Sequence, residues 1–183
     1  MLTTLFVSAQ VTDTIVSTTP SNRNVLIEEY TGINCGYCPD GHRRANEIMA
    51  ANPDRVCVIN IHQGSYAANT YTTSFGNALA NQIGLSGYPA GTVNRHLFSQ
   101  YSNVLDLERQ YWATASNTIM NMSSPVNIAA DGTLDWSTRT LTVRVQLYYT
   151  AAQSNVSTNS LNVAILQDNV LGSQSGLQIR IKS

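Results

Sequence analysis

The chain has 183 residues, of which 43% are hydrophobic and 11% are charged, and its formal net charge at pH 7 is -1. This length suffices for one ordinary domain and a small second one. Because the net charge is close to zero, nothing indicates a basic surface for nucleic acid or an anionic membrane. No apolar run reaches the roughly 20 residues that span a bilayer. We therefore expect neither a nucleic-acid partner nor a membrane-spanning segment.

The first residues have the pattern that ends a secretory signal. An apolar run at Leu5–Val7 precedes the small residues Ser8 and Ala9, although the usual basic start is missing. We interpret residues 1–23 as a signal remnant with a polar lead-in; the alternative is an ordinary frayed terminus. Export would bring the chain into oxidising conditions that permit disulfides, so we expect a periplasmic or outer-membrane-associated protein.

Residues 24–62 predict a strand, a helix and a second strand. The apolar run Val25–Ile27 is typical of a buried strand, and the helix is expected to begin at Cys35. A second buried strand is expected over Arg55–His62. Two strands joined by a helix in this way run parallel, with a right-handed crossover.

The rest of this first domain, which we place at residues 24–122, is expected to contain two helices and one strand. The pattern predicts helices over Thr73–Ile83 and Val104–Met122, and a strand over Thr92–Phe98. In the helix expected over Thr73–Ile83, the apolar stripe consists of Phe75, Leu79 and Ile83.

The C-terminal part, residues 125–183, has the alternating pattern of strands instead of a helical one. It predicts strands over Val126–Ala130, Leu141–Tyr149 and Leu161–Ile165, with a turn at Asp131-Gly132. We expect a small all-β, sandwich-like domain. Three or four strands are few for a sandwich, so the domain is either incomplete or completed by a partner, which would make it an oligomer contact.

The three cysteines divide into a close pair and a single residue. Cys35 and Cys38 have CxxC spacing at the expected helix N-terminus, where unpaired N–H groups and the helix dipole stabilise a thiolate. We expect Cys35 to be the exposed attacking sulfur and Cys38 the recessed resolving one. Cys57 lies in the middle of an apolar strand and is interpreted as a small buried hydrophobe.

The strand Val25–Thr31, followed by Cys35-Gly36-Tyr37-Cys38-Pro39, resembles the thioredoxin superfamily. The longer run EEYTGINCGYCPDGHRRANEI, together with GYPAGTVNR, is similar to a Bacteroidetes family of thioredoxin-like proteins related to twenty-eight-kilodalton outer-membrane proteins. The resemblance spans roughly residues 24–172. It implies an α/β fold: a thioredoxin-like domain with a mixed central sheet flanked by helices, followed by the β-rich domain.

The resemblance also implies roles for particular residues. Glu29, six residues before Cys35, would be the buried acid that relays a proton. Pro89 would follow a cis peptide bond and face the disulfide; for an X–Pro bond the cis form costs only about 0.5–1 kcal/mol relative to trans. The residues expected to contact a substrate are Gly36, Tyr37 and Tyr88.

Two departures from the family pattern bear on activity. Asn34 stands where thioredoxins usually have Trp, and an apolar residue, Ile59, stands where they usually have Lys. These departures leave the redox potential and the choice of partner open.

The sequence therefore favours an extracytoplasmic thiol–disulfide oxidoreductase that exchanges electrons with a protein thiol or disulfide partner and needs no cofactor. The alternative is a cell-envelope binding or assembly protein in which the Cys pair is a structural disulfide and nothing is catalysed. A third hypothesis is a copper site formed by Cys35, Cys38 and His62, with His42 nearby. For both histidines, ordinary hydrogen bonding is the simpler interpretation.

Overall fold

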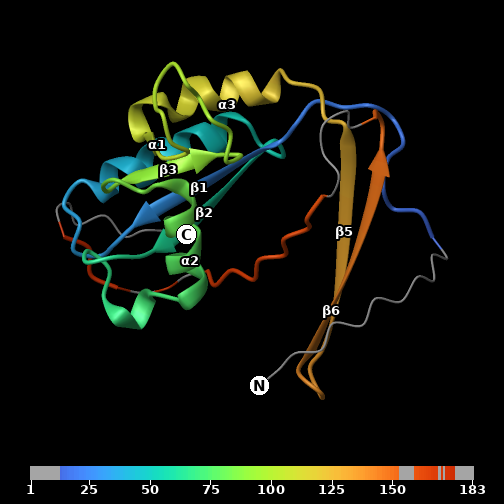
Figure 1. The fold of residues 1–183 in the computed structure, drawn as a ribbon. Coiled ribbons are helices and arrows are strands. Elements are labelled where there is room, and N and C mark those ends of the chain that lie inside the picture. Colours follow the sequence, from blue (N-terminus) through green and yellow to red (C-terminus); the bar gives the residue numbers. More distant parts are fainter. Residues whose placement is uncertain (1–12, 153–158, 169, 171, 176–183) are drawn as a thin grey trace. The chain divides into compact units, whose positions relative to one another are not determined.

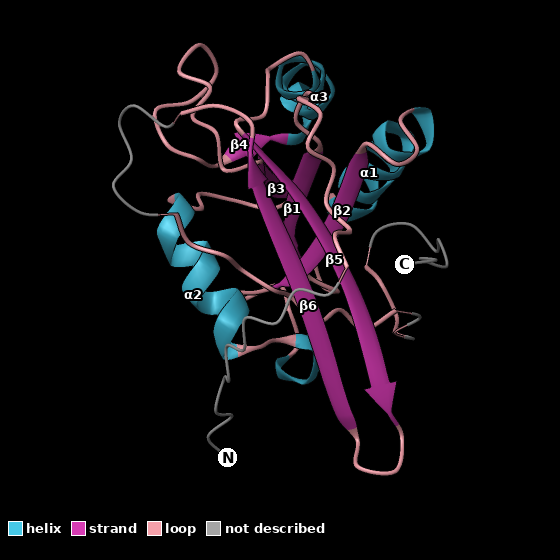
Figure 2. Cartoon of the chain, turned by 90° about the vertical axis from the view of Figure 1, so that its right-hand side faces the viewer, coloured by secondary structure: helices cyan, strands magenta, loops and turns pink. Residues whose placement is uncertain are grey.

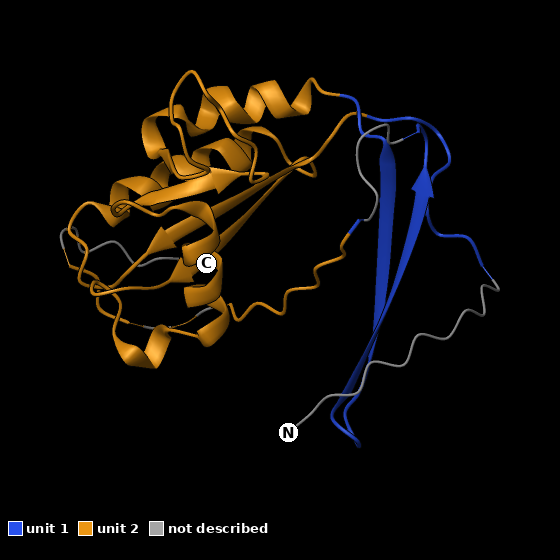
Figure 3. Ribbon diagram, in the orientation of Figure 1, with its two compact units in different colours: residues 1–21, 123–159 blue, residues 22–122, 160–183 orange. Residues whose placement is uncertain are grey.

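The computed structural model describes residues 13–152, 159–168, 170 and 172–175. The chain divides into two compact units, one of residues 22–122 with 160–183 and the other of residues 1–21 with 123–159 (Figure 3). The proposed signal remnant at residues 1–9 lies outside the described residues. None of the helices in the described ranges has the length and apolarity needed to cross a membrane.

The larger unit contains a four-stranded mixed sheet (Figure 1). Its strands are β1 (Val25–Thr31), β2 (Val56–His62), β3 (Ala90–Val93) and β4 (Leu107–Glu108), in the order β2-β1-β3-β4. The first pair, β1 and β2, is parallel, and the remaining pairs are antiparallel. Since α1 (Cys38–Ala51) joins β1 to β2, the predicted strand–helix–strand unit is confirmed.

Helices cover both faces of this sheet, with α1 and α3 (Trp112–Met120) on one side and α2 (Ser74–Ile83) on the other (Figure 2). Because side chains alternate along a strand, Val25 and Ile27 pack with α1 and α3, whereas Tyr30 packs with α2. Successive residues of β1 therefore face different helices, and Glu29 lies on the α1 side.

The helix α1 begins at Cys38, three residues later than predicted. Tyr37 occupies the N-cap position, and Pro39 lies in the first turn, where its missing N–H costs no hydrogen bond. Cys35 thus lies in the loop that precedes the helix. The prediction that Cys35 begins the helix is wrong.

Two predicted burials are also wrong. Cys57 is exposed, because β2 is an edge strand that pairs with β1 alone. Phe75 is 80% exposed, and α2 instead buries Gly76, Ala80 and Ile83. The apolar run of β2 does not distinguish an edge strand from a central one, which explains the first error.

The segment that follows β3 differs most from its prediction. The strand covers Ala90–Val93, and the chain then turns through Asn94 and Arg95, which have positive φ angles. The predicted helix Val104–Met122 is helical only in its second half. Leu107 pairs with Gly91 in the sheet, and a 3₁₀ turn, η2 (Arg109–Tyr111), precedes α3. Sheet pairing overrides the local helical pattern here.

The smaller unit contains a hairpin of two antiparallel strands, β5 (Val126–Asp135) and β6 (Thr140–Tyr149). The expected turn at Asp131-Gly132 lies inside β5, and the chain turns at residues 136–139 instead. The predicted strand Leu161–Ile165 is not a strand. In the described residues the β-rich part is therefore a two-stranded sheet, not a sandwich.

The two faces of the hairpin differ in polarity. Paired residues on one face are apolar, as in Ile128 with Leu147. On the other face, the side-chain amide of Asn127 donates to backbone carbonyls of residues 17 and 19, and that of Gln146 donates to the carbonyl of Asp13. The polar lead-in at residues 13–21 is thus bound to the polar face of the hairpin.

Candidate functional site

Cys35 and Cys38 form a disulfide, with their Cα atoms 5.4 Å apart. The loop is held by its own backbone: the Cys35 N–H donates to the Gly32 carbonyl (3.1 Å), and the Cys38 N–H donates to the Cys35 carbonyl (3.3 Å). Cys38 is fully buried, as predicted, but only 3% of Cys35 is exposed. The prediction of an exposed Cys35 is wrong.

The disulfide nevertheless lies close to the protein surface. The residues on either side of Cys35, Asn34 and Gly36, are exposed, and Tyr37 is 75% exposed. Gly36 and Tyr37 are thus accessible beside the disulfide, as a substrate contact requires.

A segment from the other end of the chain is bound to the same loop. The Gln174 side-chain amide donates to the carbonyls of Cys35 (2.9 Å) and Gly32 (3.1 Å). The Ser175 N–H donates to the Ile33 carbonyl (2.7 Å). No local sequence pattern predicts this contact, because the two segments are separated by 139 residues.

Glu29 is completely buried on the side of the sheet that faces α1. Its Oε2 lies 2.9 Å from Nδ1 of His42, whereas its Oε1 is buried with no hydrogen-bond partner among the described residues. Burial raises the pKa of Glu29 above its ordinary value, and the hydrogen bond and charge of His42 act in the opposite direction. This carboxyl therefore holds its proton more tightly than one in water.

His42 connects Glu29 to a second group. Its Nε2 lies 3.2 Å from the Thr31 hydroxyl, which is also fully buried. Sequence reasoning missed this role of His42. The available signal was its spacing, because a residue four positions after Cys38 lies on the same face of the helix.

Gly41 of α1 lies next to both Glu29 and Pro89. A Cβ atom on Gly41 would lie 2.5 Å from Glu29 Oε1 and 2.8 Å from Pro89 Cβ. Only glycine fits where α1 passes this close to both residues. Since Gly41 lies one helical turn after Cys38, Glu29 and Pro89 both approach α1 one turn from the disulfide-bonded Cys38.

The Tyr88–Pro89 peptide bond is cis, which confirms that prediction. The Tyr88 hydroxyl donates to the Gln63 side chain, and its ring packs edge-to-face on Tyr66 with centroids 5.4 Å apart. Burial raises the pKa of Tyr88. Tyr88 is held against the loop after β2, and its contact with a substrate stays a prediction.

His62 lies beside Thr31 in the sheet register, at the end of β2. Burial and the charge of His42 both lower the pKa of His62. Within the described ranges, no group of three His, Cys, Asp or Glu side chains is placed to hold a metal ion. With both cysteines in a disulfide, the copper hypothesis gains no support.

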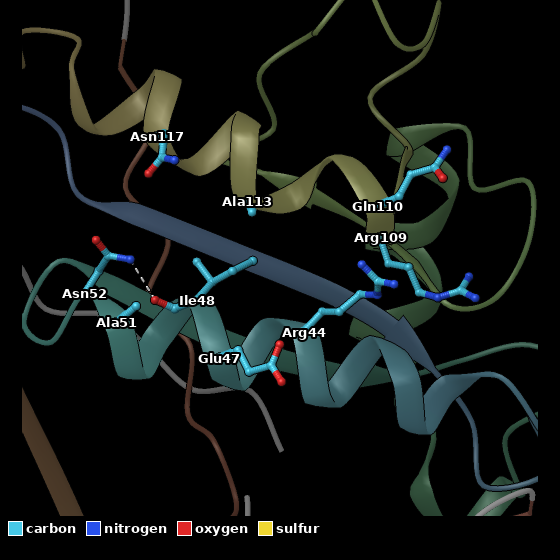
Figure 4. A pocket seen from close by; sticks show the side chains of 9 residues that line it. All are labelled: Arg44, Glu47, Ile48, Ala51, Asn52, Arg109, Gln110, Ala113 and Asn117. Carbon is cyan, nitrogen blue, oxygen red and sulfur yellow. Dashed lines mark hydrogen bonds between the residues drawn. The ribbon is translucent and has the colours of Figure 1, made fainter.

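The outer face of α1 carries a charge cluster that stands apart from the disulfide. Asp40 accepts hydrogen bonds from Arg43, Arg44 and Arg109, and these guanidinium groups hold the pKa of Asp40 well below its ordinary range. Arg44 and Arg109 border an open depression of about 460 Å³ between α1 and α3 (Figure 4). Both arginines bind Asp40, and the carboxylate of Glu47 also lines the depression, so little net positive charge is left for an anion.

No protein-family model and no curated protein matches the chain. One similar solved structure is HBP35 of Porphyromonas gingivalis, with 22% identity and a TM-score of 0.47. The match covers 62% of this chain but only 38% of that one.

A second similar structure, a structural-genomics target from Agrobacterium tumefaciens, has 8% identity and a TM-score of 0.40. That match covers 72% of this chain and 76% of the other. Likeness at these levels does not assign the chain to a family. The family resemblance therefore stays a prediction.

Proposed function

We propose that the chain is an exported thiol–disulfide oxidoreductase with a thioredoxin-like fold. The observation that carries this proposal is an arrangement around α1: Cys38 of the disulfide begins the helix, and the buried acid Glu29 and the cis-proline Pro89 both lie against Gly41, one helical turn later. A disulfide is stable in oxidising compartments, which supports a periplasmic or outer-membrane-associated location.

The proposed reaction is thiol–disulfide exchange with a protein partner. A partner thiolate attacks Sγ of Cys35, the Cys35–Cys38 bond breaks, and the bonding electrons leave on Cys38. A second partner thiol then displaces Cys35, so that the partner becomes a disulfide and this chain a dithiol. Two electrons come from the partner, and no cofactor is needed. The reverse sequence oxidises a partner dithiol.

Access to Cys35 requires one change. Because Gln174 binds the Cys35 carbonyl and Cys35 is 3% exposed, we infer that Gln174 must release this loop before a partner docks. Gly36 and Tyr37 then form the exposed part of the docking surface, with Tyr88 at its edge.

The burial of Cys35 also favours a second candidate function. A disulfide with both residues buried is typical of a structural link, and structural disulfides resist reduction. In this alternative the chain is a cell-envelope binding or assembly protein, and the β-rich part contacts a partner or a second copy.

One experiment separates the two functions. Insulin reduction with dithiothreitol is measured for the wild type, for Cys35→Ser and for Cys57→Ser, which makes the same change at the exposed free cysteine. We expect catalysis in the wild type, its complete loss in Cys35→Ser and no change in Cys57→Ser. Gln174→Ala should raise the rate severalfold. A wild type that neither catalyses the reaction nor loses its disulfide in dithiothreitol would establish the structural alternative.

A further inference from the structure

The two oxygens of the Glu29 carboxyl have different surroundings. Oε2 is held by Nδ1 of His42, and His42 is in turn held at Nε2 by the Thr31 hydroxyl. Oε1 is buried, has no hydrogen-bond partner among the described residues, and lies against Gly41, which Pro89 also approaches. A buried oxygen without a partner is costly. Its position beside the first turn of α1 therefore indicates a role there.

We propose that His42 is a positioning residue that fixes Glu29 so that Oε1 exchanges a proton with the sulfur of Cys38, directly or through one water. This inference rests on the proposed oxidoreductase function and deepens it. The chemistry of a buried acid alone needs only Glu29. The new element is that His42 on α1 sets the orientation and proton affinity of Glu29.

The proton balance follows from thiol–disulfide exchange. When the disulfide is reduced, Cys38 leaves as a thiolate and takes the proton of Glu29, which becomes a carboxylate. The Nδ1–H of His42 then donates to this carboxylate, and the Thr31 hydroxyl donates to Nε2. In the reverse direction, the carboxylate removes the Cys38 proton, and the sulfur attacks a mixed disulfide at Cys35.

The charged groups on the elements around Glu29 have other partners. On β2, His62 faces the same side and interacts with His42. On α1, Asp40 is bonded to arginines on the outer face. On β1, the neighbouring Glu28 points to the opposite face, where Arg95 and Thr92 bind it. Within the described chain, His42 is the titratable group with a direct contact to Glu29.

The test follows the step in which Cys38 attacks. The reduced full-length chain is mixed with glutathione disulfide, and release of the second glutathione is measured from pH 5 to pH 9. The Glu29 titration is followed in parallel by carbon NMR of labelled glutamate, assigned with Glu29→Gln. The variants are His42→Leu, which removes the N–H, and His42→Asn, which keeps an amide near the Nδ1 position. His96→Asn is the matched control at a histidine that packs on Phe98.

We expect His42→Leu to move both the Glu29 midpoint and the pH profile to higher pH, because the contact with His42 favours the carboxylate. The attack of Cys38 on the mixed disulfide should become roughly tenfold slower at pH 7. This is less than the roughly 10²–10⁴-fold typical of complete loss of acid–base assistance, because Glu29 itself stays in place. His42→Asn should restore most of the rate, and His96→Asn should match the wild type. Thr31→Val, which removes only the support at Nε2, should give a smaller shift in the same direction and serves if His42→Leu does not fold.

Two results would overturn the inference. One is a Glu29 midpoint and pH profile that do not change in His42→Leu or Thr31→Val. The other is an equal loss in His42→Leu and His42→Asn, since this indicates packing alone. If the wild type itself never forms or resolves the mixed disulfide, the proposed function fails, and the inference fails with it. That outcome is recognised without any variant.

Discussion

The larger unit and the hairpin β5–β6 are both built on strands with apolar side chains, but they bury those side chains to different extents. Val25 and Ile27 of β1 are almost completely covered by helices. On the hairpin, Ile128 is 59% exposed and Leu147 is 43% exposed. An alternating pattern therefore predicts a strand, but burial depends on what covers it. A two-stranded sheet alone is marginally stable, so the stability of the described chain should come mainly from the larger unit.

The largest expected effect compares the two tryptophans. Trp112 is fully buried in the larger unit and donates to the Leu107 carbonyl, whereas Trp136 in the hairpin turn is 81% exposed. Trp112→Ala should lower the free energy of unfolding by about 3–5 kcal/mol. Trp136→Ala should change it by less than about 0.5 kcal/mol. Urea unfolding followed by circular dichroism measures both, and comparable losses would contradict the difference in burial.

The features predicted correctly from the sequence are those that local pattern determines. The apolar run of β1 predicts its burial, and the strand–helix–strand spacing predicts the parallel pairing of β1 with β2. The Cys35–Cys38 disulfide and the cis bond before Pro89 were also predicted, the latter from the family resemblance.

The features predicted wrongly depend on contacts between distant segments. Leu107 leaves its helical pattern to pair with Gly91 in the sheet. Cys35 is buried and bonded to Gln174, far along the chain. The strand expected at Leu161–Ile165 has the right alternation but no paired neighbour in the described residues. None of these outcomes is encoded within a window of ten or fifteen residues.

A medium effect is expected from adding one methyl group in each unit. In Gly41→Ala the new Cβ meets Glu29 and Pro89, whereas in Gly132→Ala on β5 the nearest atom is 3.7 Å away, an ordinary contact. Overpacking typically costs about 1–3 kcal/mol, of which the helix preference for alanine recovers up to about 1 kcal/mol. Gly41→Ala should therefore lose about 1–2 kcal/mol in urea unfolding, and Gly132→Ala should be neutral. A neutral Gly41→Ala would show that α1 can move away from Glu29.

The smallest effect compares a buried carboxyl with an exposed one. Glu29 has a raised pKa because it is buried, whereas Asp131 on β5 has a lowered pKa because it pairs with Arg144. A group whose folded-state pKa is raised favours folding at low pH, and this contribution is lost as the pH rises through the folded-state pKa. Glu29→Gln removes that loss, because the amide stays neutral.

We therefore expect Glu29→Gln to match the wild type near pH 4 and to have a higher urea midpoint at pH 8. Asp131→Asn, which makes the same kind of change on the hairpin, should leave the difference between pH 4 and pH 8 unchanged within error, because its ion pair is in water. If Glu29→Gln instead has a lower midpoint than the wild type at pH 8, then the ionised pair with His42 stabilises the fold by more than the burial of Glu29 costs. That result would mean that the buried pair of Glu29 and His42, together with the apolar core, makes the larger unit more stable than the hairpin.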